Sequence, residues 1–325
     1  MTAIPIIRLA QSLEGPAEFD ACARAIAAAC ERSGFFGIED HGVPRVVIER
    51  TLAAARGFFA QPIERKHLVR RERPELNRAY IGFGAETLAR LAGRETPPDA
   101  KEVYTVGPEG YPEDEYHTCA AARPHWGPNR WPAEPAGFRA DVLAYWEQMQ
   151  GLKLRLTRLF AHVLGVDENY FPRRMARSPD QLRLIHYPAL TQACAPGQLR
   201  AGEHTDLGFL TAVYSDNNAL GGLEVRDRNG DWVAAPNFDG FMVNIGDTLM
   251  RWCNNRWKST PHRVVNPPIT LAGSDRISLA FFAIPDYDTT IACLPSCIDS
   301  AHPPLYPPVT MGEYRAQRFA NTANA

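Results

Sequence analysis

The first part of the chain alternates short apolar runs with stretches in which apolar residues recur every three or four positions. Residues 17–32 place Phe19, Cys22, Ile26 and Cys30 at such spacings, which is typical of an amphipathic helix, and Gly34 follows as a stop signal. The elements predicted in this region are a strand over residues 4–9, a helix over 17–32, a strand over 35–38 and a helix over 45–59 that ends near Pro62.

A longer helical pattern occupies residues 137–164. Its apolar positions form one repeating stripe: Val142, Tyr145, Met149, Leu152, Leu156 and Phe160. A stripe of this width on one side of a helix is typical of packing against a sheet rather than of a binding surface. We therefore expect a long helix that supports a sheet.

From Leu182 onward the pattern changes to short β-rich runs separated by turn signals. The turns are predicted at residues 216–218, 228–231 and 272–275. Such a series favours a double-stranded β-helix, or jelly roll, in which two sheets enclose a cavity. The proline-rich stretch 303–308 is predicted to be a stiff surface connection before a final helix. The expected fold class is mixed α and β.

A chain of 325 residues with 45% hydrophobic residues can bury a large core, and β-barrel architectures often exceed the usual length of one domain. We expect a single domain. Its parts are an N-terminal helical and strand region (1–135), a long supporting helix (136–175), a jelly-roll core (180–290) and a C-terminal extension (291–325).

Three residues have the chemistry of metal ligands. In a strand, alternate side chains project to the same face, so His204 and Asp206 can reach one ion, and His262 must arrive from another part of the fold. Two imidazoles and one carboxylate that leave other positions open are the ligand set of non-haem Fe(II) oxygenases. An isolated His-x-Asp is a weak signal. Here the pair passes into an apolar strand, and His262 follows Pro261, which strengthens the interpretation.

Arg276 and Ser278 share one face of a segment that is otherwise apolar. A guanidinium that points into a barrel is costly to desolvate unless it meets an anion, and its planar fork matches a carboxylate. The alternative is an exposed arginine on an edge strand beside a serine that faces solvent. The nearby metal motif favours the anion site.

These motifs, in this order and spacing, resemble the isopenicillin N synthase-like Fe(II)/2-oxoglutarate-dependent dioxygenases. The resemblance covers nearly the whole chain. Besides the ligand motifs it includes Ile4-Pro5-Ile6-Ile7, Ser33-Gly34-Phe35-Phe36, His41-Gly42-Val43-Pro44, Asn129-Arg130-Trp131-Pro132, Gly221-Gly222-Leu223-Glu224-Val225 and Asn244-Ile245-Gly246-Asp247.

The resemblance implies the jelly-roll fold, a requirement for Fe(II), 2-oxoglutarate and O2, and binding of the distal carboxylate of 2-oxoglutarate by Arg276 and Ser278. Tyr187 matches the family tyrosine whose hydroxyl helps to hold the co-substrate. Many plant relatives carry Asn-Tyr-Tyr where this chain has Ile185-His186-Tyr187, so one polar contact is replaced here. His186 is expected to pair with a neighbour on the outer face. No catalytic side chain is expected beyond the metal centre.

The resemblance also suggests which residues line the approach to iron. These are Arg78, Tyr80, Phe83, Glu102, Phe209 and Phe282. The expected reaction is oxidation of an unactivated C–H bond of a small molecule, by hydroxylation, desaturation or cyclisation, with release of succinate and CO2, as in secondary metabolism. The sequence does not identify the substrate.

Two alternatives remain open at this stage. An oxidase related to isopenicillin N synthase would use the same ligands without 2-oxoglutarate, although the Arg276–Ser278 pair argues against it. From another class, a non-catalytic small-molecule binding protein with a metal-bearing barrel, or a structural zinc protein, would use the same donors.

The formal charge of −2 and a pI near 6.5 provide no broad cationic field, so nucleic acid and anionic membrane are poor candidate partners. No obligate protein partner is indicated, and no apolar stretch approaches the length of a membrane span. Seven scattered cysteines argue against a disulfide framework and favour a reducing compartment, so we expect a cytoplasmic protein. Cys293 and Cys297 are expected to be ordinary thiols.

Overall fold

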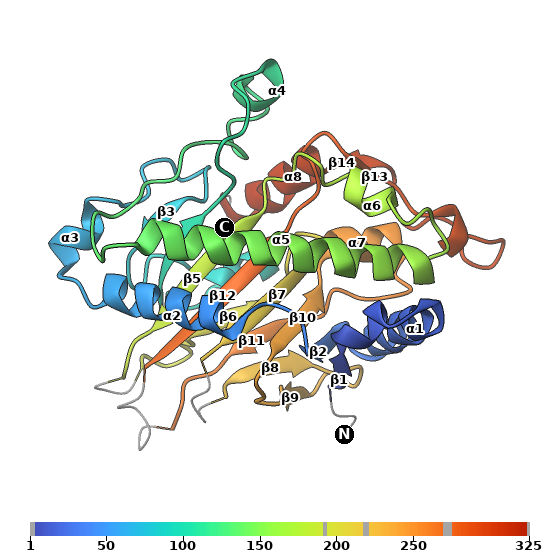
Figure 1. Cartoon of the computed structure of the whole chain (residues 1–325), viewed down its shortest axis with the longest axis horizontal. Coiled ribbons are helices and arrows are strands. Elements are labelled where there is room, and N and C mark those ends of the chain that lie inside the picture. Colours follow the sequence, from blue (N-terminus) through green and yellow to red (C-terminus); the bar gives the residue numbers. More distant parts are fainter. Residues whose placement is uncertain (1–3, 191–193, 217–220, 269–274, 324–325) are drawn as a thin grey trace.

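An eight-stranded sheet runs through the centre of the molecule (Figure 1). The computed structural model describes residues 4–190, 194–216, 221–268 and 275–323. In spatial order the strands are β1 (Ile6–Arg8), β2 (Phe35–Glu39), β10 (Phe241–Ile245), β7 (Leu210–Ser215), β12 (Arg276–Ala283), β5 (Gln181–Tyr187), β4 (Glu102–Val106) and β3 (Ala79–Ile81).

A smaller sheet faces the large one. Its strands, again in spatial order, are β6 (Ala201–His204), β11 (His262–Val264), β8 (Leu223–Arg226) and β9 (Trp232–Ala234). A two-stranded ribbon of β13 (Thr290–Ile291) and β14 (Val309–Thr310) lies apart from both. Two facing sheets with mainly antiparallel pairing form the jelly-roll core that the β-rich half of the sequence predicts.

Helices cover the outer face of the large sheet. The long helix α5 (Phe138–Val163) crosses its strands in Figure 1, and α1 (Pro16–Arg32) and α2 (Arg45–Phe59) pack beside α5. All six apolar residues of the predicted stripe on α5 are buried. Each such side chain removed from water contributes about 1.5–3 kcal/mol to folding, which holds the helix against the sheet.

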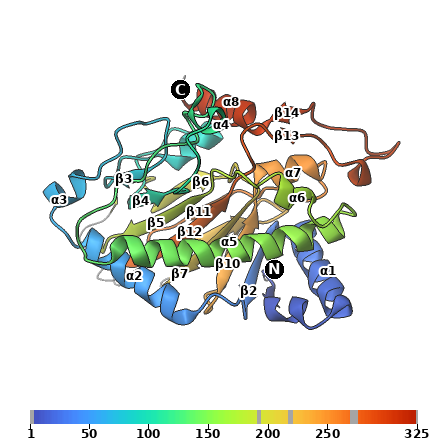
Figure 2. The ribbon, with the colours of Figure 1, turned by 45° about the horizontal axis from the view of Figure 1, so that its top comes forward.

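Shorter helices complete the described structure. They are α3 (Ile63–His67), α4 (Glu115–Thr118), α6 (Tyr170–Arg173), α7 (Asp247–Trp252) and α8 (Met311–Ala323), with 3-10 turns at Leu9–Leu13, Leu88–Ala92 and Pro295–Cys297. Figure 2 shows α8 on the side of the molecule away from α1 and α2. Among the described residues, no helix is both long enough and apolar enough to cross a membrane.

Alternation along the central strands separates a helix-covered face from an inner face. In β12, Ile277, Leu279 and Phe281 belong to the large hydrophobic core beneath the helices. The residues that alternate with them, Arg276, Ser278, Ala280 and Phe282, line the space between the two sheets. A strand whose alternate residues face opposite ways therefore contributes to a packed core and to an inner cavity at the same time.

Most predicted elements are confirmed with small changes at their ends. The helix expected over 17–32 spans Pro16–Arg32, and the one expected over 45–59 has those bounds. The strand expected over 4–9 is shorter, because Leu9 opens a 3-10 turn. The turns expected at 216–218 and 272–275 fall largely outside the described residues.

Two strands of the N-terminal part were not predicted. β3 and β4 extend the large sheet beyond β5, and β1 and β2 extend its other end. The first 135 residues therefore contribute half of the strands of the large sheet. The four-part division of the domain stays a prediction. Strand pairing joins residues of its first and third parts into one sheet.

Candidate active site

The three predicted metal ligands meet at one end of the small sheet. His204 closes β6 and His262 opens β11, and the antiparallel pairing of these strands sets the two histidines directly opposite each other. Asp206 lies in the loop after β6. Its Oδ1 is 3.8 Å from His204 Nε2, and its Oδ2 is 3.9 Å from His262 Nε2. Among the described residues, these three form the one group of metal-ligating side chains that is close enough to share an ion.

Hydrogen bonds orient both imidazoles toward the centre of this group. His204 Nδ1 lies 2.7 Å from the carbonyl oxygen of Gly202, and His262 Nδ1 lies 3.1 Å from that of Thr260. Because a carbonyl oxygen only accepts, each Nδ1 carries the proton and each Nε2 presents a lone pair. Backbone carbonyls commonly fix metal-binding histidines in this way.

The carboxylate of Asp206 is held by two donors. Thr211 Oγ1 donates to Asp206 Oδ2 at 2.5 Å, and Asn244 Nδ2 donates to the same oxygen at 2.7 Å. Burial alone would raise the pKa of Asp206, but His262, His204 and these donors together lower it below its ordinary value. Burial, and then the neighbouring His262, lower the pKa of His204 to about 3. The carboxylate of Asp206 is therefore charged and the imidazole of His204 is neutral, which are the forms that bind a cation.

The backbone around Asp206 is fixed by the segment from Asn244 to Asp247. The N–H of Asp247 donates to the carbonyl oxygen of Asp206 at 2.7 Å. A Cβ on Gly246 would lie 2.1 Å from the carbonyl oxygen of Gly208, so this close approach requires glycine. The motif noted in the sequence thus positions the ligand loop.

The donor set fits ferrous iron. Two ligand atoms that each lie about 2 Å from a common ion are at most about 4 Å apart. The carboxylate of Asp206 meets this limit with both histidines, at 3.8 Å from His204 Nε2 and 3.9 Å from His262 Nε2. Two imidazoles and one carboxylate on one side of an ion leave positions for other ligands.

The ligands open into a cavity of about 220 Å³ between the two sheets. Alternate residues of four strands line it. They are Gln181, Arg183, Ile185 and Tyr187 of β5, Thr211, Val213 and Ser215 of β7, Met242 and Asn244 of β10, and Arg276, Ser278, Ala280 and Phe282 of β12. The three residues expected to hold the co-substrate, Arg276, Ser278 and Tyr187, thus share one cavity with the metal ligands.

Glu102 and Tyr80 lie outside the lining of this cavity, contrary to expectation. Glu102 pairs with His186 across β4 and β5, and His186 alternates with the cavity-facing Ile185 and Tyr187. Both side chains therefore point to the other face of the sheet. There Glu102 accepts hydrogen bonds from Tyr80 Oη and, at 2.8 Å, from Lys66 Nζ.

Three further residues of the expected approach to iron also lie elsewhere. Arg78 is buried behind the cavity wall and donates to the carbonyl oxygens of Asn77 and His125. Phe83 is 54% exposed, so it is a surface residue. Phe209 packs against the rings of Phe160 and Phe171 in the helix-covered core. Of the six residues, Phe282 lines the cavity.

His186 pairs with a neighbour on the outer face, as expected. Its Nδ1 lies 2.8 Å from Glu102 Oε1, and its ring stacks on Phe59 with 5.1 Å between centroids. All seven cysteines, including Cys293 and Cys297, are free thiols.

Several polar residues of the cavity were missed in the sequence. They are Asn77, Lys101, Gln181, Arg183, Arg315 and Arg318. The alternation that carried Tyr187 inward extends back to Gln181 and Arg183, so counting by two along this strand would have found both. Arg315 and Arg318 lie on α8, and the sequence contains no signal that places this helix on the cavity.

Two family models match the chain. Residues 4–134 match the model described as non-haem dioxygenase in morphine synthesis N-terminal, and residues 179–285 match the 2OG-Fe(II) oxygenase superfamily. The gap between them holds α5 and α6.

Similar proteins agree over most of the chain. A 2-oxoglutarate-Fe(II) type oxidoreductase, hxnY of Emericella nidulans, is 33% identical over 87% of this chain and 79% of its own length. The proline hydroxylase buaE of Petromyces alliaceus is 32% identical over 95% of this chain and 96% of its own. The crystal structure of a full-length Neurospora crassa protein in complex with alpha-KG superimposes with a TM-score of 0.85, at 33% identity, over 98% of this chain and 96% of that one. The chain belongs to the Fe(II)/2-oxoglutarate-dependent dioxygenases, and it is an oxygenase of small molecules.

Proposed function

We propose that Arg276, Ser278 and Tyr187 bind 2-oxoglutarate, and that the rest of the cavity holds a small molecule whose C–H bond is oxidised. The observation that carries this assignment is the buried guanidinium of Arg276. It is 5% exposed, it lines the same cavity as the metal ligands, and within the described ranges it forms no ion pair with a carboxylate. A buried cation without a counterion is costly, so an anionic ligand is the natural partner.

The surroundings of Arg276 suit a carboxylate. Its Nη1 donates to the carbonyl oxygen of Gly221, and its Nε is buried without a hydrogen-bond partner. The guanidinium lies 4.5 Å from the ring centroid of Tyr187, which holds its plane. Ser278 Oγ lies 2.8 Å from Ser215 Oγ, so one hydroxyl can support the other while it donates to the ligand. These contacts leave donors free for a co-substrate carboxylate.

His204, Asp206 and His262 would hold the iron. When bound, ferrous iron supplies the activation of O2 and the oxidative decarboxylation of 2-oxoglutarate to succinate and CO2, coupled to oxidation of the substrate. The side chains supply position: Thr211 and Asn244 keep Asp206 ionised and in place, and Arg276 fixes the far end of the co-substrate. Hydrogen abstraction requires no side-chain base, and none is assigned.

The proposed site of action is the cytoplasm, on a free small molecule rather than on nucleic acid or within an obligate protein complex. Seven free cysteines and a net charge of −2 support this assignment. Relatives solved with small ligands, such as the Neurospora crassa protein with thymine and JOX2 with JA, support a small-molecule substrate. A role in secondary metabolism is proposed from the relatives named as proline hydroxylase and validamycin A dioxygenase.

Succinate release measured against 2-oxoglutarate concentration tests the assignment. The Arg276→Gln variant should raise the KM for 2-oxoglutarate by about 10- to 100-fold, because a charge-assisted hydrogen bond contributes about 1.5–3 kcal/mol. Arg173→Gln, at a position whose side chain is 72% exposed, is the matched control and should leave the KM unchanged. Oxygen consumption that continues unchanged without 2-oxoglutarate would instead support an oxidase and overturn the proposal.

A further inference from the structure

The cavity carries more positive charge than the metal site requires. Its charged lining consists of one carboxylate, Asp206, and five cations: Lys101, Arg183, Arg276, Arg315 and Arg318. Asp206 is a metal ligand, so its charge is directed to the ion. Whether each cation is paired with a protein carboxylate therefore indicates how many anions the cavity can bind.

Three of the five cations are neutralised by protein carboxylates. Lys101 Nζ lies 2.8 Å from Asp99, Arg183 Nη2 lies 2.6 Å from Glu86, and Arg318 Nη2 lies 3.3 Å from Asp247. Arg276 and Arg315 form no ion pair with a carboxylate in the part of the chain that the structure describes. These two guanidiniums of the cavity are therefore available to bind an anion. The proposed function assigns 2-oxoglutarate to Arg276.

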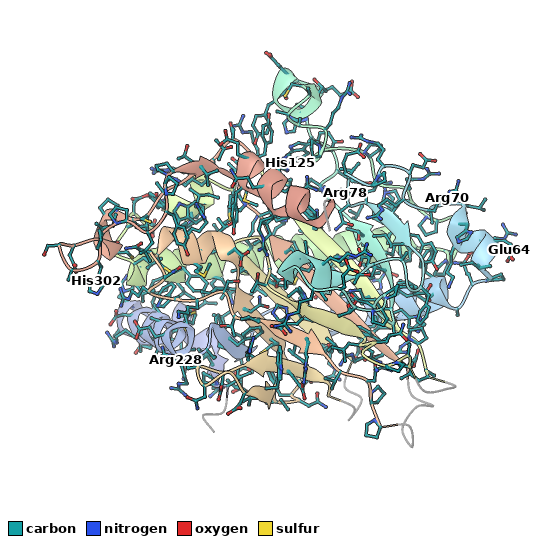
Figure 3. All side chains as sticks on the ribbon, turned by 180° about the vertical axis from the view of Figure 1, so that it is seen from behind. Glu64, Arg70, Arg78, His125, Arg228 and His302 are labelled. Carbon is teal, nitrogen blue, oxygen red and sulfur yellow. The ribbon has the colours of Figure 1, made fainter. Side chains whose placement is uncertain are left out.

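Positive charge predominates around Arg315 in the described part of the chain. Its Nη2 donates to the carbonyl oxygen of Glu75 at 2.9 Å. Burial lowers the pKa of Arg315 to about 10, and the charge of Glu75, which is paired with Arg73, opposes this only in part. Burial also lowers the pKa of the neighbouring Arg78 to about 10. Burial, together with the charges of Arg315 and Arg78, lowers the pKa of His125 to about 3, so this ring is neutral at physiological pH. Figure 3 labels Arg78 and His125 near α8.

Neutral donors and acceptors surround the same end of the cavity. Asn77 Nδ2 donates to Gln181 Oε1 at 2.9 Å, and both residues line the cavity. Arg78 donates to the backbone oxygen of Asn77, which places this amide pair beside the Arg315 region. The amide group of Gln181 and the ring of His125 therefore lie within the same wall as Arg315.

Helix α8 is fixed to the loop that carries the metal ligands. Arg318 Nη2 donates to Thr205 Oγ1 at 3.1 Å, and Thr205 lies between His204 and Asp206. Tyr314 Oη donates to Asp247 Oδ2 at 3.3 Å. Arg315 stands between these two anchors on the helix, so its position relative to the iron ligands is set by rigid contacts.

We propose that Arg315 binds a carboxylate of the primary substrate, which makes this enzyme an oxygenase of small organic acids. The carboxylate lies against α8, and the carbon to be oxidised points toward His204, Asp206 and His262. This inference rests on the proposed function, because Arg276 must be occupied by 2-oxoglutarate for Arg315 to remain as the second anion site. One free guanidinium matches a singly charged carboxylate better than a doubly charged phosphate. The apolar side chains of Leu88, Leu91 and Phe319 suit the carbon skeleton between the two ends.

A panel of small carboxylic acids, each paired with its own primary amide, tests the proposal. Binding is measured by ligand-observed NMR on the full chain under anaerobic conditions with Fe(II) and saturating 2-oxoglutarate. At least one acid should bind ten or more times more tightly than its amide. In Arg315→Gln, binding of that acid should weaken at least tenfold while binding of the amide stays the same. Arg315→Lys, which keeps the charge without the fork, should restore part of the preference.

Two controls test whether Arg315 acts through binding rather than through folding. Gln317→Ala, at an exposed position of α8, should leave acid binding unchanged. The melting temperature of Arg315→Gln should equal or exceed that of the unsubstituted protein, because an uncompensated cation has been removed; a fall of several degrees would make Arg315 a structural residue and overturn the proposal.

The remaining outcomes also decide the matter. Failure of every acid to bind, equal binding of acid and amide, or an acid preference that survives Arg315→Gln would each overturn the assignment. An acid preference that is lost in Arg276→Gln but kept in Arg315→Gln would place the acid in the co-substrate site. Failure of 2-oxoglutarate itself to bind would count against the proposed function, and it is recorded in a separate titration.

Discussion

Two buried carboxylates, Asp206 and Glu102, have similar surroundings but opposite roles. Each is less than 10% exposed and each faces histidine. The nitrogens that face Asp206 are the Nε2 atoms of His204 and His262, which carry lone pairs because both Nδ1 atoms face carbonyl oxygens. A carboxylate and two lone pairs cannot satisfy one another, so this group requires a cation.

Glu102 is surrounded by hydrogen-bond donors instead. Lys66 Nζ donates to it at 2.8 Å, Tyr80 Oη donates to the same oxygen, and His186 Nδ1 approaches the other oxygen at 2.8 Å. Burial alone would raise the pKa of Glu102, but these three donors lower it below its ordinary value. Since every oxygen already has a donor, this cluster is closed and structural. The partner atoms, rather than burial or residue type, therefore distinguish a ligand site from a structural network.

Loss of a metal ligand should give the largest effect. The His262→Ala variant removes one of two imidazoles from the ion, so we expect succinate release to fall by about 10³-fold or more. His186→Ala is the matched control, because it removes a strand histidine from the Glu102 cluster and should change turnover by less than about threefold. Iron content and succinate release are measured for both variants. Equal losses in the two would contradict the distinction between the clusters.

Loss of the structural carboxylate should reduce stability rather than chemistry. Glu102→Gln leaves the Lys66 ammonium buried without a counterion, which costs about 3–5 kcal/mol of unfolding free energy. Chemical denaturation measures this cost, and iron content measured below the transition should be unchanged. Glu64→Gln, at an exposed position of α3, should change stability by about 0.5 kcal/mol or less. A Glu102→Gln variant as stable as this control would show that the network contributes nothing.

Added Fe(II) should stabilise the protein through the Asp206 group and should not act through the Glu102 cluster. Anaerobic Fe(II) at one hundred times its Kd should raise the unfolding free energy by about 2.7 kcal/mol through binding to the folded state. Glu102→Gln should keep this increment, and His262→Ala should lose it. The measurement is a denaturation curve with and without Fe(II). An increment retained in His262→Ala would place the ion elsewhere.

Asp286 is an intermediate case and gives the smallest effect. It is buried and accepts a hydrogen bond from the backbone N–H of Arg177 at 2.8 Å, but the guanidinium of Arg177 lies 4.0 Å away, too far for a hydrogen bond. Burial therefore prevails and raises the pKa of Asp286 to about 6. Because this pKa lies above the unfolded value, the folded state binds more protons between about pH 4 and 6, and stability falls as pH rises through that window.

The Asp286→Asn variant should lose this part of the pH dependence. The unfolding free energy of this variant at pH 7 should exceed that of the unsubstituted protein by about 1–3 kcal/mol. Denaturation curves at several values between pH 4 and 7 test this, with the exposed Asp167→Asn as control. A pH profile identical to that of the unsubstituted protein would mean that Asp286 is already ionised across the window.

Local sequence pattern was sufficient to predict helices α1, α2, α5 and α8 and to indicate the ligand set. The stripe on α5 predicted both its length and its buried face, because helical spacing alone brings those side chains together. The His204–Asp206 spacing predicted a shared ligand face, and Arg276 with Ser278 predicted an inward-facing polar pair. In each case the relevant distance is set by a few neighbouring residues of the chain, although Asp206 lies in the loop after β6 rather than in the strand.

The approach to iron was predicted poorly for a physical reason. Tyr80 and Glu102 were assigned to the cavity, but a shift of one residue in strand parity sends a side chain to the opposite face. β3 and β4 are short and buried along their whole length, so their sequences carry no alternation that would fix the parity. The pairing of β4 with β5 decides which side chains of β4 face the cavity, and the paired residues lie about eighty positions apart in the sequence.

Spacing along the chain was enough to predict the main elements, the pair His204 and Asp206 and the inward-facing Arg276 and Ser278, and the motif around His262 supplied the third ligand. Long-range packing decided which cations of the cavity lack a carboxylate partner among the described residues and which helix lines the cavity. Arg315 has the same chemistry and helical context as the exposed arginines of this chain. It differs because α8 is held against the ligand loop by Arg318 and Tyr314, and the partners of a charge are set by the whole fold rather than by its neighbours in sequence.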